Sequence, residues 1–455
     1  MQQDVIVALD IGTSSVRAGV FDLRAVPIAA PVARPQQVDT ENGGADINAE
    51  TMVDSVTTCL QEASAGYRVR AVALSTFWHS AVGVDGDGRA VTPVLTWADT
   101  RAGAQVRFLQ AHVDVADVHR RTGCLVHTSY LPARLRWVKE VHPEWRVVQW
   151  LSPGEYLMRR LAGRSVCSLS MATATGLFDS RRKMWDAELM DLCGVVASQL
   201  PEVSDGAVEV AGVRWMAPLG DGACSNVGCG AIGEGDVAIM LGTSGALRRL
   251  AAWPTEDWSV PDGLWRYALD ARRVVTGGAV SNGGNVWAWM DQVLAAGEVE
   301  GEPDGHGLTM LPFLAGERSP GWHSEARATL HGLRWGTTAA DIRQAGMEAV
   351  AYQLAAVRDR LPRPARLVAT GGVFERSPQW LQMLADALGE PLYRSPWAEA
   401  SSRGAVLMAL DALGLIEALA PVPLGEAVEP CMDRHVRYAA GRRRQEELYR
   451  TFFPS

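Results

Sequence analysis

The chain of 455 residues lacks several features that would place it in a special class of protein. Its seven cysteines are odd in number and are never spaced as Cys-x-x-Cys, which argues against a disulfide framework or a structural zinc site. No uncharged stretch approaches the roughly 20 residues that a membrane-spanning helix requires. The first residues, Met1-Gln2-Gln3-Asp4, lack the basic region of a secretory signal. We therefore expect a cytoplasmic protein without a membrane partner.

Acidic residues also outnumber basic residues, so the formal net charge of the chain is -9 at pH 7. The resulting field repels a phosphate backbone, so we expect no nucleic-acid partner. A short basic run, Arg442-Arg443-Arg444, is followed closely by Glu446 and Glu447, as is typical of a solvated helix face. An anionic substrate would therefore have to be recognised by local arginines.

Two common phosphate-binding signatures are missing: a Gly-x4-Gly-Lys-Ser/Thr loop, and a Gly-x-Gly-x-x-Gly turn that opens a helix. Instead, glycine-rich turns follow three apolar, strand-like runs: Asp10-Ile11-Gly12-Thr13-Ser14-Ser15, Gly242-Thr243-Ser244-Gly245 and Thr370-Gly371-Gly372. The first turn is predicted to be a tight hairpin, because a second strand-like run follows it at once. One such turn would indicate only an ordinary hairpin. Three turns, spread over both halves of the chain, predict a split ATP site.

The turns supply candidate nucleotide-binding residues, because glycine lets a phosphate approach the backbone closely. A loop at Gly371 and Gly372 could hold an adenine ring against backbone amides, or it could be a plain connection between a strand and a helix. The candidates for holding phosphate oxygens lie at the two other turns: Gly12, Thr13, Ser14, Gly242 and Thr243.

Strand and helix signals alternate in two series, and 455 residues are too many for one ordinary core. We expect an α/β protein with two lobes, residues 1–233 and 234–455. The clearest helix signals lie in the second lobe. One helix is expected to follow Thr338 as its N-cap, and another to run between Ser377 as N-cap and Gly389 as the stop.

Two aspartates could carry the chemistry that these turns predict. Asp10 ends a strand beside the first turn, where its carboxylate could hold a hydrated magnesium ion; the alternative is an ordinary turn aspartate. Asp221 lies in a run of mostly small residues, 218–230, which permits close approach of a ligand. Asp221 could accept the proton of an attacking hydroxyl and contribute to the magnesium site, or it could be the N-cap of a helix that begins near Ala223.

These segments resemble the FGGY family of carbohydrate kinases over nearly the whole chain. The turns at Asp10 and Gly242 are similar to the family's two phosphate motifs, the segment at Asp221 to its catalytic-base segment, and residues 369–372 and 382–386 to its adenosine segment. The resemblance implies the actin-like ATPase fold, of ribonuclease H-like type, in which two domains close an interdomain cleft on ATP and Mg²⁺. It also implies that Asp221 is the catalytic base and that Asp10 lies on the magnesium side.

Within the family, four further segments are most similar to those of gluconate kinases: His79-Ser80 and residues 96–101, 277–284 and 314–322. This resemblance implies that His79 contacts a sugar hydroxyl, although a histidine after a strand would by itself indicate a hydrogen-bonded structural residue. Trp97 belongs to the same expected substrate site.

Three charged residues in these segments have more than one interpretation. Asp99 and Arg101 could bind substrate hydroxyls and a carboxylate, or they could pair with each other at a domain surface. Arg318 could receive an anion, but Glu317 beside it could neutralise the region.

We expect an ATP-dependent kinase that transfers the γ-phosphoryl group to the terminal hydroxyl of a sugar acid, D-gluconate, and gives 6-phosphogluconate. The nearest alternative is a kinase for a ketopentose such as xylulose, because the same fold and base serve both. An alternative of another class is a nucleotide-dependent actin-like switch that phosphorylates no small molecule. The expected partners are ATP and a sugar or sugar acid, and a homodimer is compatible with this expectation.

Overall fold

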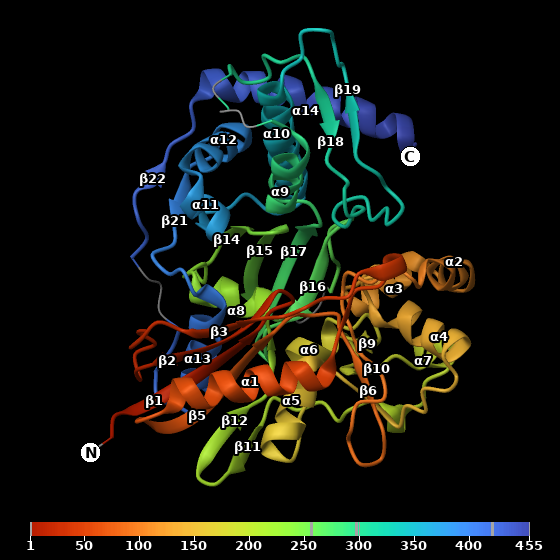
Figure 1. Ribbon diagram of the computed structural model, residues 1–455, viewed down its shortest axis with the longest axis vertical. Helices are drawn as coiled ribbons and strands as arrows, with labels where there is room; N and C mark the ends of the chain where they lie inside the picture. The colour runs from red at the N-terminus through yellow and green to blue at the C-terminus, as the bar shows by residue number, and fades with distance from the viewer. Residues whose placement is uncertain (1, 255–257, 296–298, 300, 420–422, 455) are drawn as a thin grey trace.

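The computed structural model describes residues 2–254, 258–295, 299, 301–419 and 423–454, and it has two lobes that are built around two seven-stranded sheets (Figure 1). The first lobe occupies the lower half of the view and the second lobe the upper half. Both lobes combine strands with helices, so the expected α/β class is confirmed. In the described part of the chain, no helix is both long and apolar enough to span a bilayer.

The sheet of the first lobe consists of β1 (Asp4–Ile11), β2 (Ser15–Phe21), β3 (Val32–Pro35), β5 (Arg68–Thr76), β11 (Ala207–Val210), β12 (Val213–Met216) and β13 (Leu219–Gly220). Its strand order is β11-β12-β5-β1-β2-β3, and β13 also pairs with β5. β1 is antiparallel to β2 and parallel to β5, so that Asp10 lies between Arg17 and Ser75. The first glycine-rich turn is therefore the hairpin that the sequence predicted.

The sheet of the second lobe consists of β14 (Asp236–Leu241), β15 (Gly245–Ala252), β16 (Trp265–Ala268), β17 (Arg273–Val280), β20 (Arg366–Thr370), β21 (Leu392–Arg394) and β22 (Ala427–Val428). Its strand order is β16-β17-β15-β14-β20-β21-β22. β14 is antiparallel to β15 and parallel to β20, which repeats the arrangement of β1 with β2 and β5. The two hairpins consequently occupy equivalent places in the two sheets.

Helices cover both faces of β1, which explains its nearly continuous apolar sequence. Successive side chains of a strand point to opposite faces of its sheet. Leu9 packs in a core with α1 (Ala49–Ser64), whereas Ala8 packs with α13 (Ala400–Ala412). In Figure 1, α13 lies beside β1 and β2 although it belongs to the second half of the sequence. The chain therefore returns to the first lobe before it ends.

The remaining elements surround the two sheets. Four short antiparallel pairs are β4 (Asp46–Ile47) with β7 (Val94–Leu95), β6 (Val82–Val84) with β8 (Gln149–Leu151), β9 (Phe178–Asp179) with β10 (Met184–Trp185), and β18 (Thr309–Leu311) with β19 (Thr329–His331). The other helices are α2 (Gly103–His112), α3 (Val115–Thr122), α4 (Leu131–Val141), α5 (Pro153–Ala162), α6 (Leu169–Thr173), α7 (Ala187–Cys193), α8 (Asp221–Gly228), α9 (Gly284–Val293), α10 (Ala339–Arg358), α11 (Gly372–Arg376), α12 (Pro378–Leu388) and α14 (Met432–Phe452).

Both helices with clear sequence signals in the second lobe are confirmed. Thr338 caps α10, and its side chain and that of Asp341 form a reciprocal capping box. Ser377 accepts a hydrogen bond from the backbone of α12, which ends at Gly389 in the left-handed conformation.

Candidate active site

The two hairpins are closed by matching backbone hydrogen bonds. The amide of Gly12 donates to the Ser15 carbonyl at 3.0 Å, and the amide of Gly242 donates to the Ser244 carbonyl at 2.9 Å. The strands that precede the hairpin tips are largely buried. The tip residues themselves are at least partly accessible: Gly12, Thr13, Ser14, Gly242 and Thr243. The geometry therefore presents the candidate phosphate-binding backbone at the surface of each lobe.

Two glycines bring the candidate adenine loop and α9 against the second hairpin. Gly371 has a φ of 111°, and a Cβ atom added there would collide with the backbone of Leu241 at the end of β14. A Cβ atom added at Gly284 would lie 2.7 Å from the carbonyl oxygen of Gly242. Only glycine permits both close approaches. Gly372, the second glycine of the loop, is the first residue of α11.

A cavity of about 720 Å³ lies beside this junction. Such a volume suits a nucleoside. Trp287, Val373 and Trp380 contribute apolar walls, and Asp291 and Arg376 contribute charge. The cavity is the best candidate for the adenosine part of the split ATP site.

Asp10 is the next-to-last residue of β1 and is held by its neighbours. Ser75 Oγ donates a hydrogen bond of 2.8 Å to Asp10 Oδ1, and Arg17 Nη1 lies 3.9 Å from Asp10 Oδ2. Burial raises the pKa of Asp10 to about 6; the Ser75 hydrogen bond opposes this shift, and the nearby Asp221 carboxylate adds to it. The two neighbouring carboxylates of Asp10 and Asp221 form an oxygen donor set that fits a hard cation such as Mg²⁺.

Asp221 is the first residue of α8, and Gly220 is its N-cap. The alternative that Asp221 itself caps a helix is therefore wrong. Asp221 Oδ1 accepts a hydrogen bond of 2.7 Å from the Gly222 amide. Burial raises the pKa of Asp221, whereas the positive charge of Arg248 and the Gly222 hydrogen bond oppose the shift. A carboxylate with these opposing influences can accept a proton in a closed site.

His79 lies in an aromatic cluster with a fixed ring orientation. Its Nδ1 is 2.6 Å from the carbonyl oxygen of Ala174, so Nδ1 must carry the proton and Nε2 is left as an acceptor. Its ring lies edge-on to those of Tyr130 and Tyr267, with centroids 4.9 and 5.2 Å away. Burial and, to a smaller extent, the nearby positive charge of Arg318 lower the pKa of His79 to about 3, although the hydrogen bond to Ala174 opposes this shift. A neutral His79 can accept a hydrogen bond from a substrate hydroxyl.

Arg134, which the sequence analysis missed, holds three segments of this site together. Its Nη1 donates to the carbonyls of Leu95 and Thr96 at 2.9 and 2.7 Å. Its Nη2 donates to the carbonyl of Ser129 at 2.7 Å and to that of His79. Burial lowers the pKa of Arg134 to about 10. The available signal was an arginine in a mostly apolar segment, residues 131–138.

Asp99 and Arg101 form an ion pair with each other, which is one of the two roles that the sequence left open for them. Arg101 Nη2 lies 2.5 Å from Asp99 Oδ2 and 2.6 Å from Asp46 Oδ1. The Arg101 guanidinium also lies 4.5 Å above the ring centroid of Trp137. Trp97 lies differently, because its ring is 4.3 Å from the guanidinium of Arg318. Of these three residues, Trp97 is the one that contacts Arg318.

Glu317 and Arg318 are neighbours in sequence with separate partners. Arg318 Nε donates to Ser281 Oγ at 3.3 Å. Glu317 Oε2 instead accepts a hydrogen bond of 2.8 Å from the Tyr449 hydroxyl. Among the described residues, no ion pair joins Glu317 to an arginine. In the described part of the chain, Glu317 therefore does not neutralise Arg318 through an ion pair.

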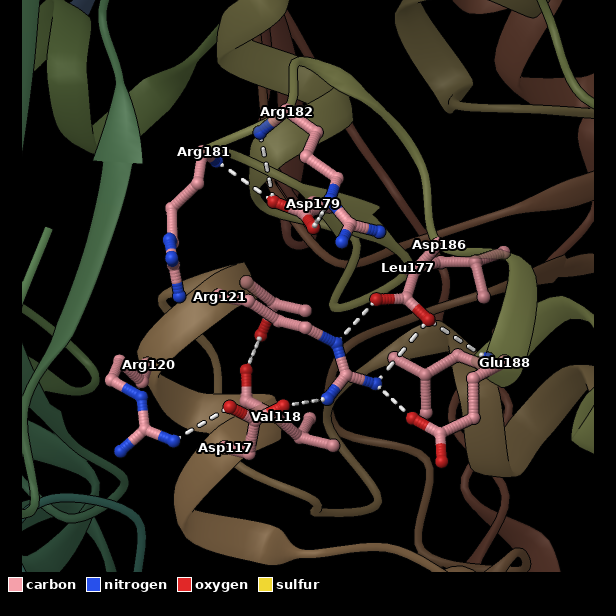
Figure 2. Close-up of polar contacts among 12 residues, drawn as sticks. Asp117, Val118, Arg120, Arg121, Leu177, Asp179, Arg181, Arg182, Asp186 and Glu188 are labelled. Carbon is pink, nitrogen blue, oxygen red and sulfur yellow. Dashed lines mark hydrogen bonds and ion pairs between the residues drawn. The ribbon is translucent and has the colours of Figure 1, made fainter.

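Charged side chains surround a separate cavity of about 820 Å³, and several of them pair with one another. Figure 2 shows Arg121 at the centre of this network, with Asp117 on one side and Asp186 and Glu188 on the other. Asp179 accepts hydrogen bonds of 2.9 Å from the two backbone amides at the start of the β9–β10 turn. None of the candidate catalytic residues lines this cavity. The network stabilises the junction of α3, α7 and this hairpin.

Comparison with known proteins identifies relatives over nearly the whole chain. Residues 5–238 match the N-terminal domain, and residues 220–413 the C-terminal domain, of the FGGY family of carbohydrate kinases. The gluconokinase of Bacillus subtilis (strain 168) is 27% identical over 457 residues, which cover 90% of this chain and 88% of that protein. The xylulose kinase of Escherichia coli (strain K12) is 26% identical over 496 residues, which cover 98% of this chain and 99% of that protein.

A solved structure of similar fold agrees with these matches. The crystal structure of gluconate kinase from Lactobacillus acidophilus has a TM-score of 0.90 at 24% identity and covers 99% of both chains. The expected two-domain actin-like fold is thereby confirmed.

Proposed function

Because the chain belongs to the FGGY family of carbohydrate kinases, we propose that this ATP-dependent sugar kinase phosphorylates D-gluconate at its terminal hydroxyl and gives 6-phosphogluconate. The observation that carries the mechanism is the position of Asp221, which starts α8 and lies close enough to Asp10 to raise the pKa of that carboxyl. The choice of gluconate is supported by the similarity to gluconokinases over 90% of the chain.

Asp221 is the proposed catalytic base. Phosphoryl transfer requires a group that accepts the proton of the attacking hydroxyl, and an aspartate commonly performs this task. His79 Nε2 and Trp97 are proposed to orient the sugar. Asp99 and Arg101, which form an ion pair, are proposed to support this site and to contact the substrate.

The nucleotide is proposed to bind across both lobes. Backbone amides at Gly12, Thr13 and Ser14 in one hairpin, and at Gly242 and Thr243 in the other, would hold phosphate oxygens. Gly371 and Gly372 would border the adenosine cavity. Asp10, together with Asp221, would hold a hydrated Mg²⁺, which neutralises charge on the transferring group.

The lobes are proposed to be domains of residues 1–233 and 234–455 that close on the substrates. The two large sheets divide between β13, which ends at Gly220, and β14, which begins at Asp236. Closure would exclude water, which competes with the sugar hydroxyl for the phosphoryl group.

A xylulose kinase is the second candidate, because a protein with this activity aligns with 98% of the chain. Membership of the kinase family argues against the third interpretation, a switch that phosphorylates no small molecule.

The test measures ADP release with Mg-ATP in the presence of D-gluconate, D-xylulose, D-ribulose or glycerol. We expect the highest kcat/KM with gluconate. Selective turnover of a ketose would replace the proposed substrate and retain the kinase mechanism.

The Asp221→Asn variant should bind ADP normally and lose roughly 100-fold to 10,000-fold in kcat, because it lacks the base. The Asp54→Asn variant is the matched control, since Asp54 is an exposed residue of α1. Near-normal turnover by the Asp221 variant would exclude Asp221 as the base.

A further inference from the structure

We propose that Arg248 and Arg318 form a receptor for the carboxylate of the acceptor substrate, and that they select an acidic sugar over a neutral one. This inference rests on the proposed kinase function and names the residues that would determine its specificity.

Arg248 is a buried cation that has no hydrogen-bond or ion-pair partner in the part of the chain that the structure describes. It lies within β15 and exposes 7% of its surface. Its Nε and Nη1 are buried and make no hydrogen bond to any residue that the structure describes, and none of the ion pairs between described residues involves it. An unpaired buried guanidinium is costly in free energy. Such a group indicates that an anion completes the site when substrate is bound.

The position of Arg248 places this unpaired charge at the acceptor site. A Cβ atom added at Gly222 would lie 2.8 Å from Arg248 Nε, so the side chain passes directly against the residue that follows the base. The same Cβ atom would also meet the ring of Trp78, which precedes His79. Arg248 and Trp78 therefore both pack against Gly222, and Arg248 lies away from the hairpin tip, opposite Ala238 of β14.

Arg318 supplies a second cation, which makes only weak hydrogen bonds to the residues that the structure describes. It exposes 9% of its surface, and it donates to Ser281 Oγ at 3.3 Å and to the Val280 carbonyl at 3.4 Å. Its guanidinium lies over the ring of Trp97. Glu317 is engaged elsewhere, with Tyr449. Arg318 thus keeps hydrogen-bonding capacity for a ligand.

The charge around these arginines is unbalanced. Asp221 is the carboxylate that acts on both of them, whereas His79 and His127 are neutral because burial lowers the pKa of each ring to about 3. Burial also lowers the pKa of Arg318 to about 10, which leaves it charged at neutral pH. Two cations against one anion leave room for one further negative charge. A carboxylate can accept paired hydrogen bonds from such planar guanidinium groups.

The γ-phosphoryl group of ATP is another source of negative charge, and the experiment separates the two. Calorimetry without nucleotide would measure binding of D-gluconate and of D-glucitol, in which a CH₂OH group replaces the carboxylate. Wild-type protein should bind gluconate more tightly than glucitol. Arg248→Gln and Arg318→Gln should each weaken gluconate binding by roughly 10-fold to 100-fold, the loss expected for a charged hydrogen bond. Unchanged gluconate binding in both variants would overturn the receptor.

Steady-state kinetics provides the second measurement. The ratio of kcat/KM for gluconate to that for the best neutral acceptor should fall in both variants. An equal loss on every acceptor would overturn the proposal and assign the arginines to the phosphoryl group. Arg272→Gln is the matched control, because Arg272 is an exposed arginine of the same lobe. ADP binding by each variant confirms that it has folded, and Arg248→Lys provides a charge-retaining variant if Arg248→Gln does not fold.

The two proposals can fail separately. If wild-type protein binds gluconate but phosphorylates only another acid, the receptor stands and the named substrate is wrong. If it phosphorylates gluconate and the variants lose no preference for it, the kinase assignment stands and the receptor is wrong.

Discussion

Tyr130 and Tyr267 join the two lobes through a hydrogen bond of 2.6 Å between their hydroxyl oxygens. Tyr130 directly precedes α4, and Tyr267 belongs to β16. Both side chains are almost completely buried, and both rings contact His79. The contact therefore couples the proposed sugar-binding segment of the first lobe to the sheet of the second.

This coupling predicts a non-additive effect on stability. Tyr130→Phe and Tyr267→Phe should each lower the free energy of unfolding by about 1 kcal/mol, and the double variant should cost little more than one single variant. Chemical denaturation of the four proteins of the cycle measures the coupling. Tyr67→Phe, at a partly exposed tyrosine, is the control. Strictly additive losses would show that the two hydroxyls act independently.

The Asp10→Asn variant should need more magnesium. Asparagine can still accept the hydrogen bond of Ser75 but offers the cation a neutral oxygen. We expect the Mg²⁺ concentration for half-maximal rate to rise by about 10-fold or more at saturating gluconate. A magnesium titration of ADP release measures this shift, with Asp54→Asn as the control. Identical titration curves for wild type and Asp10→Asn would remove Asp10 from the magnesium site.

Glu317 should make stability depend on pH. Burial raises the pKa of Glu317 from an ordinary value of 4.5 to about 7, although the Tyr449 hydroxyl and the Gly321 amide oppose the shift. Between pH 4.5 and 7 the folded protein holds a proton that the unfolded chain releases, so the free energy of unfolding falls as pH rises. The full shift corresponds to about 3 kcal/mol.

The Glu317→Gln variant should remove this dependence, because glutamine is neutral and can bond to the same partners. Thermal unfolding at pH 5 and pH 8 compares it with Glu325→Gln, a control at an exposed residue. Parallel pH profiles for wild type and Glu317→Gln would contradict the raised pKa.

Gly371→Ala should weaken both the second lobe and its nucleotide site. Its φ of 111° is unfavourable for alanine, and the new Cβ would collide with Leu241. We expect a loss of stability of about 1–3 kcal/mol and weaker ADP binding. Gly336→Ala is the control, because Gly336 has open space around it. Thermal shift assays with and without ADP measure both effects, and equal stability of the two variants would argue against a tight junction at Gly371.

Local signals in the sequence were sufficient to predict the hairpins and several helices. The hairpin at Gly12 follows from a glycine turn between two apolar runs, and α10 follows from the capping residue Thr338. Both features depend on residues a few positions apart. Their interactions are therefore visible in the sequence itself.

Interactions between residues far apart in the chain could not be predicted from local sequence signals. Arg248 resembles any arginine in a strand until β15 is packed against α8, and Arg134 until its guanidinium meets five backbone carbonyls. The N-cap interpretation of Asp221 failed because Gly220 occupies that position. Asp99 and Arg101 had two interpretations, and only the folded chain shows them paired.

The sequence by itself determined the α/β class and the two glycine-rich hairpins, because each depends on short-range patterns of glycine, capping residues and apolar runs. The family was indicated by the resemblance of several separate segments to its motifs. The tertiary structure alone decided which charges are compensated. Asp99 and Arg101 neutralise each other, Glu317 is engaged with Tyr449, and Arg248 has no ion-pair partner among the described residues. The physical reason is that the cost of a buried charge depends on which groups from other parts of the chain surround it, and folding alone brings those groups together.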